Sequence, residues 1–217
     1  ATHTHSAPPA SPMLDWKPGG PPEVQANMAA YSERLRDGVA DAIASAQAHL
    51  QPAELGWNKV DVPEELFNRR WHMQEGTIPP DPFGRTTDRV RMNPPVGSPD
   101  LIEPAGPIDP TVSIVSVRAR DGRPIALLAN YSLHYVGAIP GNQVSADYFG
   151  EFARLIGVRL RRPADSGFVG LLSNGTSGDI NNINFRQRRP PREAFEQVRA
   201  VATRVADSAF RAYSEIE

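Results

Sequence analysis

The strongest constraint on the fold is a pair of apolar segments joined by a tight turn. Residues 112–119 and 124–132 are rich in apolar residues, and Arg120-Asp121-Gly122-Arg123 lies between them. An Asp-Gly pair between two apolar runs is a strong β-hairpin signal, because glycine adopts the positive φ that such turns need. The second segment contains Ile-Ala-Leu-Leu-Ala-Asn-Tyr, so we expect a central strand that is covered on both faces.

Helical periodicity marks the other large elements. Apolar residues recur every three or four positions from Glu23 to Leu50, which predicts a long amphipathic helix. We also expect helices at 146–160 and behind Pro190-Pro191, and strands at 60–62 and 168–172. This alternation predicts an α/β fold in which a mixed β-sheet is flanked by long amphipathic helices.

Two proline-rich stretches are expected to be irregular. Residues 6–22 contain many Pro, Gly and Ser residues and predict a loop behind the N-terminal segment. Residues 77–110 are also rich in proline and have little periodicity. A long irregular segment inside a compact domain usually shapes a site or a partner surface, or is disordered.

Composition excludes several classes of function. The 217 residues carry a formal net charge of -2, so no strong field attracts nucleic acid or an anionic membrane. No apolar run reaches the roughly 18 residues of a membrane span, so we expect no transmembrane segment. The chain has no cysteine, which leaves His, Asp, Glu and Tyr as possible metal ligands. It begins without Met and without the pattern of a signal peptide, so we expect it to be cut from a longer chain.

Three histidines occupy positions that suit a metal site. His3 and His5 are two residues apart, so in an extended segment both side chains leave from the same face. His134 follows an apolar strand, and functional sites gather at strand ends in α/β sheets. Imidazole is the commonest protein ligand for metals such as zinc. Two other interpretations stay open: His3 and His5 are solvated residues of the terminus, and His134 is a hydrogen-bonded core residue.

The strand at 168–172 runs into a turn rich in glycine and asparagine, which has candidate substrate-binding residues. A phosphate-binding loop would need the lysine of G-x-x-x-x-G-K-[ST], and the turn lacks it. Backbone N–H groups and amides facing a substrate oxygen suit the composition better. Asn174, Gly175 and Asp179 are the candidates, although Asp179 could instead cap the turn.

Four segments, in order, resemble the neutral/alkaline ceramidase family over about residues 1–185. Residues 1–6 resemble its G/A-T-H-x-H-S-G-P segment, and Asn68-Arg69-Arg70 resembles its N-R-S segment. The strand before His134, with Ser145-Ala146-Asp147 after it, resembles the strand that bears a zinc histidine. Residues 168–182 resemble the strand and the G-D-x-S-P-N turn beside the metal.

The resemblance implies a zinc amidase that cleaves the N-acyl bond of ceramide-like lipids by a metal-activated water. It implies that His3 and His134 bind Zn²⁺ and that His5 lies beside the metal, where it acts as the general base or orients the water. Arg69 would face the site and, with the 174–181 turn, stabilise the oxyanion or anchor the head group. The enzyme would be secreted or periplasmic, or act at a membrane surface, on a lipid or small-molecule amide.

Two departures from the family pattern widen the set of hypotheses. Asn181 stands where the family turn has its active-site serine, and an amide cannot be a nucleophile at neutral pH. The family's remaining ligands, a glutamate and a tyrosine, lie beyond the matched region. We therefore expect residues 1–217 to form part of a ceramidase-like catalytic domain, truncated at both ends. The alternatives are a family member that acts on a different ester or amide, or a non-enzymatic binding module.

Overall fold

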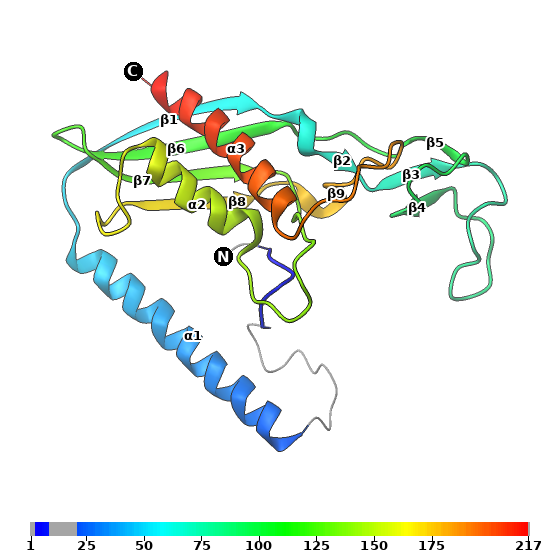
Figure 1. Cartoon of the computed structure of the whole chain (residues 1–217), viewed down its shortest axis with the longest axis horizontal. Helices are drawn as coiled ribbons and strands as arrows, with labels where there is room; N and C mark the ends of the chain where they lie inside the picture. The colour runs from blue at the N-terminus through cyan, green and yellow to red at the C-terminus, as the bar shows by residue number, and fades with distance from the viewer. Residues whose placement is uncertain (1–2, 9–20, 217) are drawn as a thin grey trace. The chain divides into compact units, whose positions relative to one another are not determined.

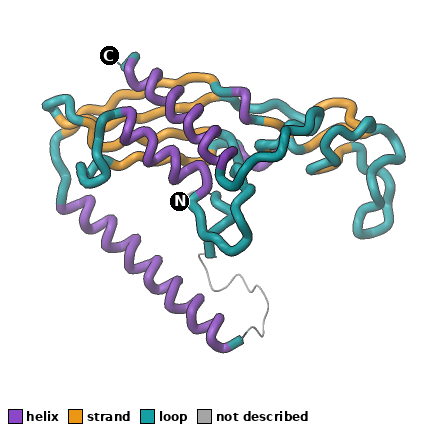
Figure 2. Tube along the Cα trace, in the orientation of Figure 1, coloured by secondary structure: helices purple, strands orange, loops and turns teal. Residues whose placement is uncertain are grey.

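The computed structural model describes residues 3–8 and 21–216, and the chain divides into two compact units. One unit is Ala7–Ala53, and the other joins Ala1–Ser6 to Glu54–Glu217. In the first unit, helix α1 spans Pro22–Ala48, which confirms the helix predicted there (Figure 2). Most of the loop predicted at 6–22 lies outside the described residues.

The larger unit is built on a four-stranded mixed sheet with the order β1-β6-β7-β8. Strands β6 and β7 pair antiparallel, with Ile114 opposite Ala129, and β7 and β8 pair parallel, with Leu128 opposite Leu171. Gly122 has a φ of 82°, which the turn between β6 and β7 requires. The hairpin and the α/β class are therefore confirmed. The strands are β1 (Ala53–Asp61), β6 (Thr111–Ala119), β7 (Pro124–Tyr131) and β8 (Val169–Asn174).

Two helices cover one face of this sheet (Figure 1). They are α2 (Asp147–Arg159) and α3 (Glu196–Ser214), close to their predicted positions. Their apolar sides meet the inward side chains of the strands in one core. Burial of each large apolar side chain stabilises the fold by roughly 1.5–3 kcal/mol. The core includes Leu127, Tyr131, Phe152, Ile156, Val201 and Val205.

The opposite face of the sheet is exposed within the described part of the chain. Leu128 and Leu171 expose 41% and 44% of their surface, and Trp57 exposes 76%. The prediction that β7 is covered on both faces is therefore wrong at Leu128 within the described residues. The continuous apolar run correctly predicts a strand. However, α2 and α3 both lie on the same side of the sheet, so buried and exposed side chains alternate along β7.

The proline-rich segment contains regular structure that periodicity did not reveal. Strands β4 (Val90–Met92) and β5 (Leu101–Pro104) flank β3 (Arg70–Met73) in an antiparallel sheet of order β4-β3-β5. Proline is tolerated in short edge strands because some edge N–H groups have no strand partner. Trp71 and Met73 pack with Phe185 in a second small core. The expectation of an irregular loop over 77–110 is thus wrong for β4 and β5.

A short pair of strands connects the residues after β1 to the turn after β8. Strand β2 (Phe67–Asn68) pairs antiparallel with β9 (Ile180–Asn181). Strand β1 is much longer than the segment predicted at 60–62. The β2–β9 pair holds Arg69 beside the turn, because the Arg69 N–H donates to the Asp179 carbonyl at 2.7 Å.

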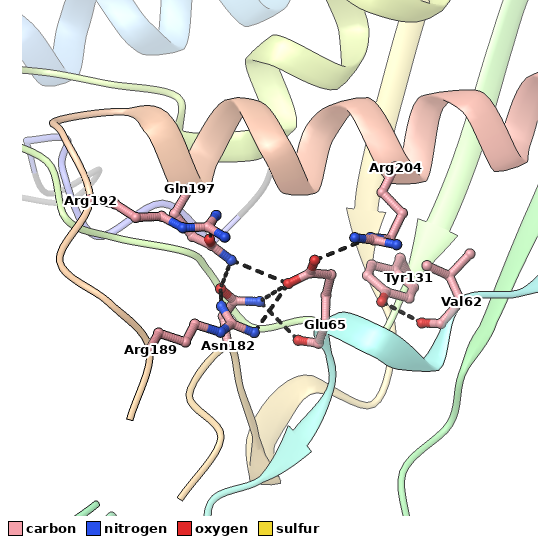
Figure 3. Close-up of polar contacts among 8 residues, drawn as sticks. All are labelled: Val62, Glu65, Tyr131, Asn182, Arg189, Arg192, Gln197 and Arg204. Carbon is pink, nitrogen blue, oxygen red and sulfur yellow. Dashed lines mark hydrogen bonds and ion pairs between the residues drawn. The ribbon is translucent and has the colours of Figure 1, made fainter. Parts of the chain in front are cut away.

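Glu65 is a buried carboxylate that fixes the end of this turn to α3 (Figure 3). It accepts hydrogen bonds from the Asn182 amide at 2.9 Å and the Gln197 amide at 3.2 Å. It also pairs with Arg189 at 3.3 Å and Arg204 at 3.2 Å. A buried carboxylate is tolerated only when paired and hydrogen-bonded, and here both conditions are met.

We expect Glu65→Gln to lower the free energy of unfolding by about 2 kcal/mol, because two arginines lose their charged partner. The arginines are partly exposed, so the loss stays below that of a fully buried pair. Urea denaturation measures the change. Glu64→Gln, at an exposed neighbouring position, is the control and should change stability by less than about 0.5 kcal/mol. Equal effects of the two substitutions would contradict this account of Glu65.

Candidate metal centre

Three imidazoles, two from the N-terminal segment and one from a residue about 130 positions later, meet at one end of the sheet. His3, His5 and His134 each offer a ring nitrogen, and these atoms lie within 4.8 Å of one another. The ring centroids of His3 and His134 are 4.3 Å apart. The Nε2 atoms of His3 and His5 are 2.9 Å apart. The structure therefore brings together all three histidines that the sequence singled out, while their role as ligands stays a prediction.

The N-terminal segment reaches the cluster through contacts with two other parts of the chain. The His3 N–H donates to Asn174 Oδ1 at 3.1 Å, just at the end of β8. Thr4 Oγ1 donates to the Ser145 carbonyl at 2.7 Å, and the Ser145 N–H donates to the Ser6 carbonyl at 2.9 Å. These bonds hold the segment so that His3 and His5 face the same side, as their spacing predicted.

Asp147 fixes the backbone just beyond His134. Its buried carboxylate accepts the N–H groups of Val136 at 3.0 Å and Gly137 at 2.8 Å. Asp147 itself has a φ of 53°, which is rare for a residue other than glycine and marks a constrained position. The sequence motif included Asp147, but only the fold shows what its carboxylate holds.

Tyr135 belongs to the site and was missed by the sequence analysis. Its ring stacks on His5 with centroids 3.8 Å apart and an angle of 15° between the planes. The stacking sets the plane of the His5 ring. An aromatic residue after an apolar strand usually belongs to the core. The position of Tyr135 next to His134 was therefore the only sequence feature that could have assigned it to the site.

The local environment keeps two of the imidazoles neutral. Burial lowers the pKa of His5, and the neighbouring charges of His3 and His134 lower it further. Burial also lowers the pKa of His134, although its bond to Ser177 acts in the opposite direction. A metal ligand must be deprotonated, so both shifts favour binding of a cation at neutral pH.

The tautomer of His134 follows from its partner. Its Nδ1 lies 2.8 Å from the Ser177 carbonyl oxygen, which can only accept, so Nδ1 carries the proton. The neutral ring then has its lone pair on Nε2, the arrangement typical of a metal-binding histidine that donates its other N–H to a carbonyl.

Arg69 is held beside this cluster by the turn. Its Nε donates to the Gly178 carbonyl at 2.9 Å. Its positive charge contributes to the lowered pKa of both His5 and His134, so it lies within electrostatic range of the imidazoles. Its predicted catalytic role stays a prediction. Asn181, the other residue predicted to be catalytic, pairs with Phe67 in the β2–β9 pair and donates to Asn93 Oδ1 at 3.3 Å.

The residues predicted to bind substrate already have partners within the chain. The Asn174 amide bonds to the backbone of His3, Leu133 and His134. The Gly175 N–H donates to the Tyr131 carbonyl at 2.9 Å. Asp179 forms an ion pair with Arg70, and its carbonyl binds the Arg69 N–H. Their substrate-binding roles are untested predictions, but the Gly175 N–H is used inside the fold.

Fold and site together define an α/β unit with a histidine cluster at the ends of two parallel strands. No family model and no curated protein matches the chain. Its structure is similar to the crystal structure of neutral ceramidase from Pseudomonas aeruginosa, with a TM-score of 0.61 and 20% identity. It is also similar to a structure described as ceramidase complexed with C2, with a TM-score of 0.65 and 20% identity.

Each similarity covers 99% of this chain and 30% of the ceramidase chain, so the chain spans less than a third of those structures. The resemblance inferred from the four motifs is therefore confirmed at the level of the fold. Within the described residues, no helix combines the length and apolar character of a membrane span.

We expect the metal-free protein to lose stability as the pH falls through the range in which His5 and His134 titrate. Their folded pKa values lie below the ordinary histidine value of about 6.5, so the unfolded chain binds protons first. The contribution of the two neutral histidines to the free energy of unfolding is complete above the pKa of the unfolded chain. It is lost as the pH falls through the folded pKa values. Urea denaturation at pH 7.5 and at pH 5, with a chelator present, measures this. The double substitution His5→Gln, His134→Gln should flatten the dependence; an unchanged slope would refute it.

Proposed function

We propose that this chain carries part of the active site of a zinc-dependent hydrolase that cleaves the N-acyl amide bond of a ceramide-like lipid. The observation that carries the proposal is the convergence of His3 and His134, beside His5, in a fold shared with ceramidase structures. The motif resemblance supplies the substrate class, and the geometry supplies a site where such chemistry could occur.

The residues present fit zinc. In a tetrahedral site with Zn–N bonds of about 2.0–2.1 Å, ligand nitrogens lie about 3.3 Å apart. The imidazole nitrogens of the cluster lie within 4.8 Å of one another, and those of His3 and His5 are 2.9 Å apart. Without an ion, one of these two rings donates an N–H to the other at that separation, and a bound cation would take the place of that proton. The donor set is also the one that zinc prefers in a chain without cysteine.

In this proposal His3 and His134 hold the cation, and the chain's other residues perform the proton transfer and charge stabilisation. When bound, zinc supplies Lewis acidity, which polarises a carbonyl and lowers the pKa of water to about 7. His5 has a lowered pKa and a fixed ring plane, so it is neutral at pH 7 and able to accept a proton.

Arg69 would stabilise the negative charge that develops on the amide oxygen. Preorganised cationic and N–H groups at such a position act most strongly where water is excluded. The bond from its Nε to Gly178 restrains the side chain before any substrate arrives. Asn181 has no nucleophilic group, so in this chain water must attack the carbonyl carbon. Secretion or a membrane-surface location belongs to the same proposal.

Asn181 also favours a second candidate function, which is a ceramide-binding or lipid-binding module without turnover. A loss of the residue that the family turn carries as serine is the change expected if catalysis had been abandoned. The retained histidines argue for metal binding in both cases. The two functions differ in whether the zinc-loaded protein hydrolyses an N-acyl amide or only binds it.

We expect the chain to bind one zinc ion, and His3→Ala or His134→Ala to weaken binding by at least about 100-fold, because a direct ligand is lost. Competition with a chromophoric chelator measures the affinity. His72→Ala is the matched control: it removes a histidine from β3, outside the cluster, and should leave the affinity unchanged. Equal zinc affinity of the unsubstituted chain, His3→Ala and His134→Ala would reject the metal site.

We expect His5→Gln to lower the rate of hydrolysis of a short-chain N-acyl sphingosine by about 10²–10⁴-fold, because the proton acceptor is lost. Zinc content, measured on the same sample, should remain close to one per chain. Turnover is followed by release of the fatty acid, with and without a chelator. If the zinc-loaded, unsubstituted protein binds this lipid without hydrolysing it, the binding-module function is correct and the hydrolase function is wrong.

A further inference from the structure

The Asn174 side chain lies at the junction of the two segments that carry His3 and His134. Its Nδ2 donates to the Leu133 carbonyl at 2.8 Å and to the His134 carbonyl at 2.9 Å. Its Oδ1 accepts the His3 N–H at 3.1 Å. Both amide hydrogens are therefore used, and one planar group connects the backbones of both histidines.

The partners of Asn174 determine the orientation of its amide. If the group were flipped, Oδ1 would face two carbonyl oxygens and Nδ2 would face an N–H group, so all three bonds would become repulsive. An aspartate at this position would have no donor for the two carbonyls. Only an amide of this length provides two donors and one acceptor in this plane.

Within the described residues, the other hydrogen bonds that tie the His3 segment to distant parts of the chain go to Ser145. Thr4 and Ser6 bond to Ser145, which precedes α2 and lies on a different element from His134. The Asn174 amide is the hydrogen-bonded group in the described chain that reaches the backbones of both His3 and His134. Ligands of a metal site must be held to within about 0.5 Å, so such a direct link controls the spacing of the two rings.

We propose that Asn174 is a positioning residue that fixes His3 against His134, and that it does not bind substrate. The proposal rests on the proposed function only where it states that the spacing of the two rings suits a bound cation. The restraint on the two rings acts in the metal-free protein as well. It replaces the substrate-binding role expected for this residue, because the amide groups such a role would use are already bonded.

Asn130 provides a matched control from the same strands. Its Nδ2 donates to Ser173 Oγ at 2.9 Å and to the Asn174 carbonyl at 3.0 Å. It is partly buried, as Asn174 is, and it also loses two donated hydrogen bonds on substitution. Neither of its bonds reaches the backbone of a histidine, so it reports the general cost of removing an amide from the β7–β8 pair.

The test compares Asn174→Ala with Asn130→Ala. In the metal-free protein, NMR should show a ring-to-ring nuclear Overhauser effect between His3 and His134, whose centroids are 4.3 Å apart. We expect Asn174→Ala to abolish it and Asn130→Ala to retain it. Zinc affinity should fall about 10–100-fold in Asn174→Ala, as for other residues that orient metal ligands, and by less than about twofold in Asn130→Ala.

Three results would overturn the proposal: the unsubstituted metal-free protein shows no ring contact, Asn174→Ala retains both the contact and the affinity, or both variants lose them equally. If the unsubstituted protein shows the ring contact but His3→Ala and His134→Ala bind zinc as well as it does, the proposed metal site fails and the NMR comparison alone decides the role of Asn174. If circular dichroism shows that Asn174→Ala does not fold, Asn174→Asp replaces it. Asn174→Asp retains the size and the acceptor of the side chain but lacks both donors. The same results are expected for it as for Asn174→Ala, and the same results would overturn the proposal.

Discussion

The parallel pairing of β7 with β8 is the constraint on which the site depends. In this register Tyr131 lies opposite Asn174, so the carboxyl ends of the two strands are adjacent. His134 follows one end, and the glycine-rich turn follows the other. Parallel strands need a crossover between them, and α2 provides it while its apolar side closes the core. The same connection therefore builds the fold and brings His134 and the glycine-rich turn to one edge.

Three imidazoles lie close together at that edge, and positive charge on a neighbouring ring disfavours protonation of His5 and His134. The lowered pKa values of His5 and His134 show that the fold disfavours positive charge on these rings, mainly through burial. Arg69 adds to the same effect. A site that resists protons while it presents lone pairs is suited to a cation with a strong preference for nitrogen.

The sequence was informative where local rules decide the structure. The Asp121-Gly122 turn and the apolar periods correctly predicted the hairpin and the helices, because turn geometry and amphipathicity are encoded over a few residues. The spacing of His3 and His5 likewise predicted their shared face. Pairing between distant segments was not visible: β4 and β5 form because β3 lies between them. The exposed face of β7 and the partners of Asn174 depend on tertiary contacts, which composition does not contain.

The turn between Asn174 and Asn182 is held at both ends, and this explains how it acts on His134. At one end Asn174 binds the backbones of the two histidine segments. At the other end Asn182 binds the buried Glu65, which is anchored to α3 (Figure 3). Between these points the Ser177 carbonyl accepts the His134 Nδ1 proton and leaves Nε2 unprotonated. Asn181 contributes to none of these bonds, so the support of the histidine cluster does not depend on its side chain.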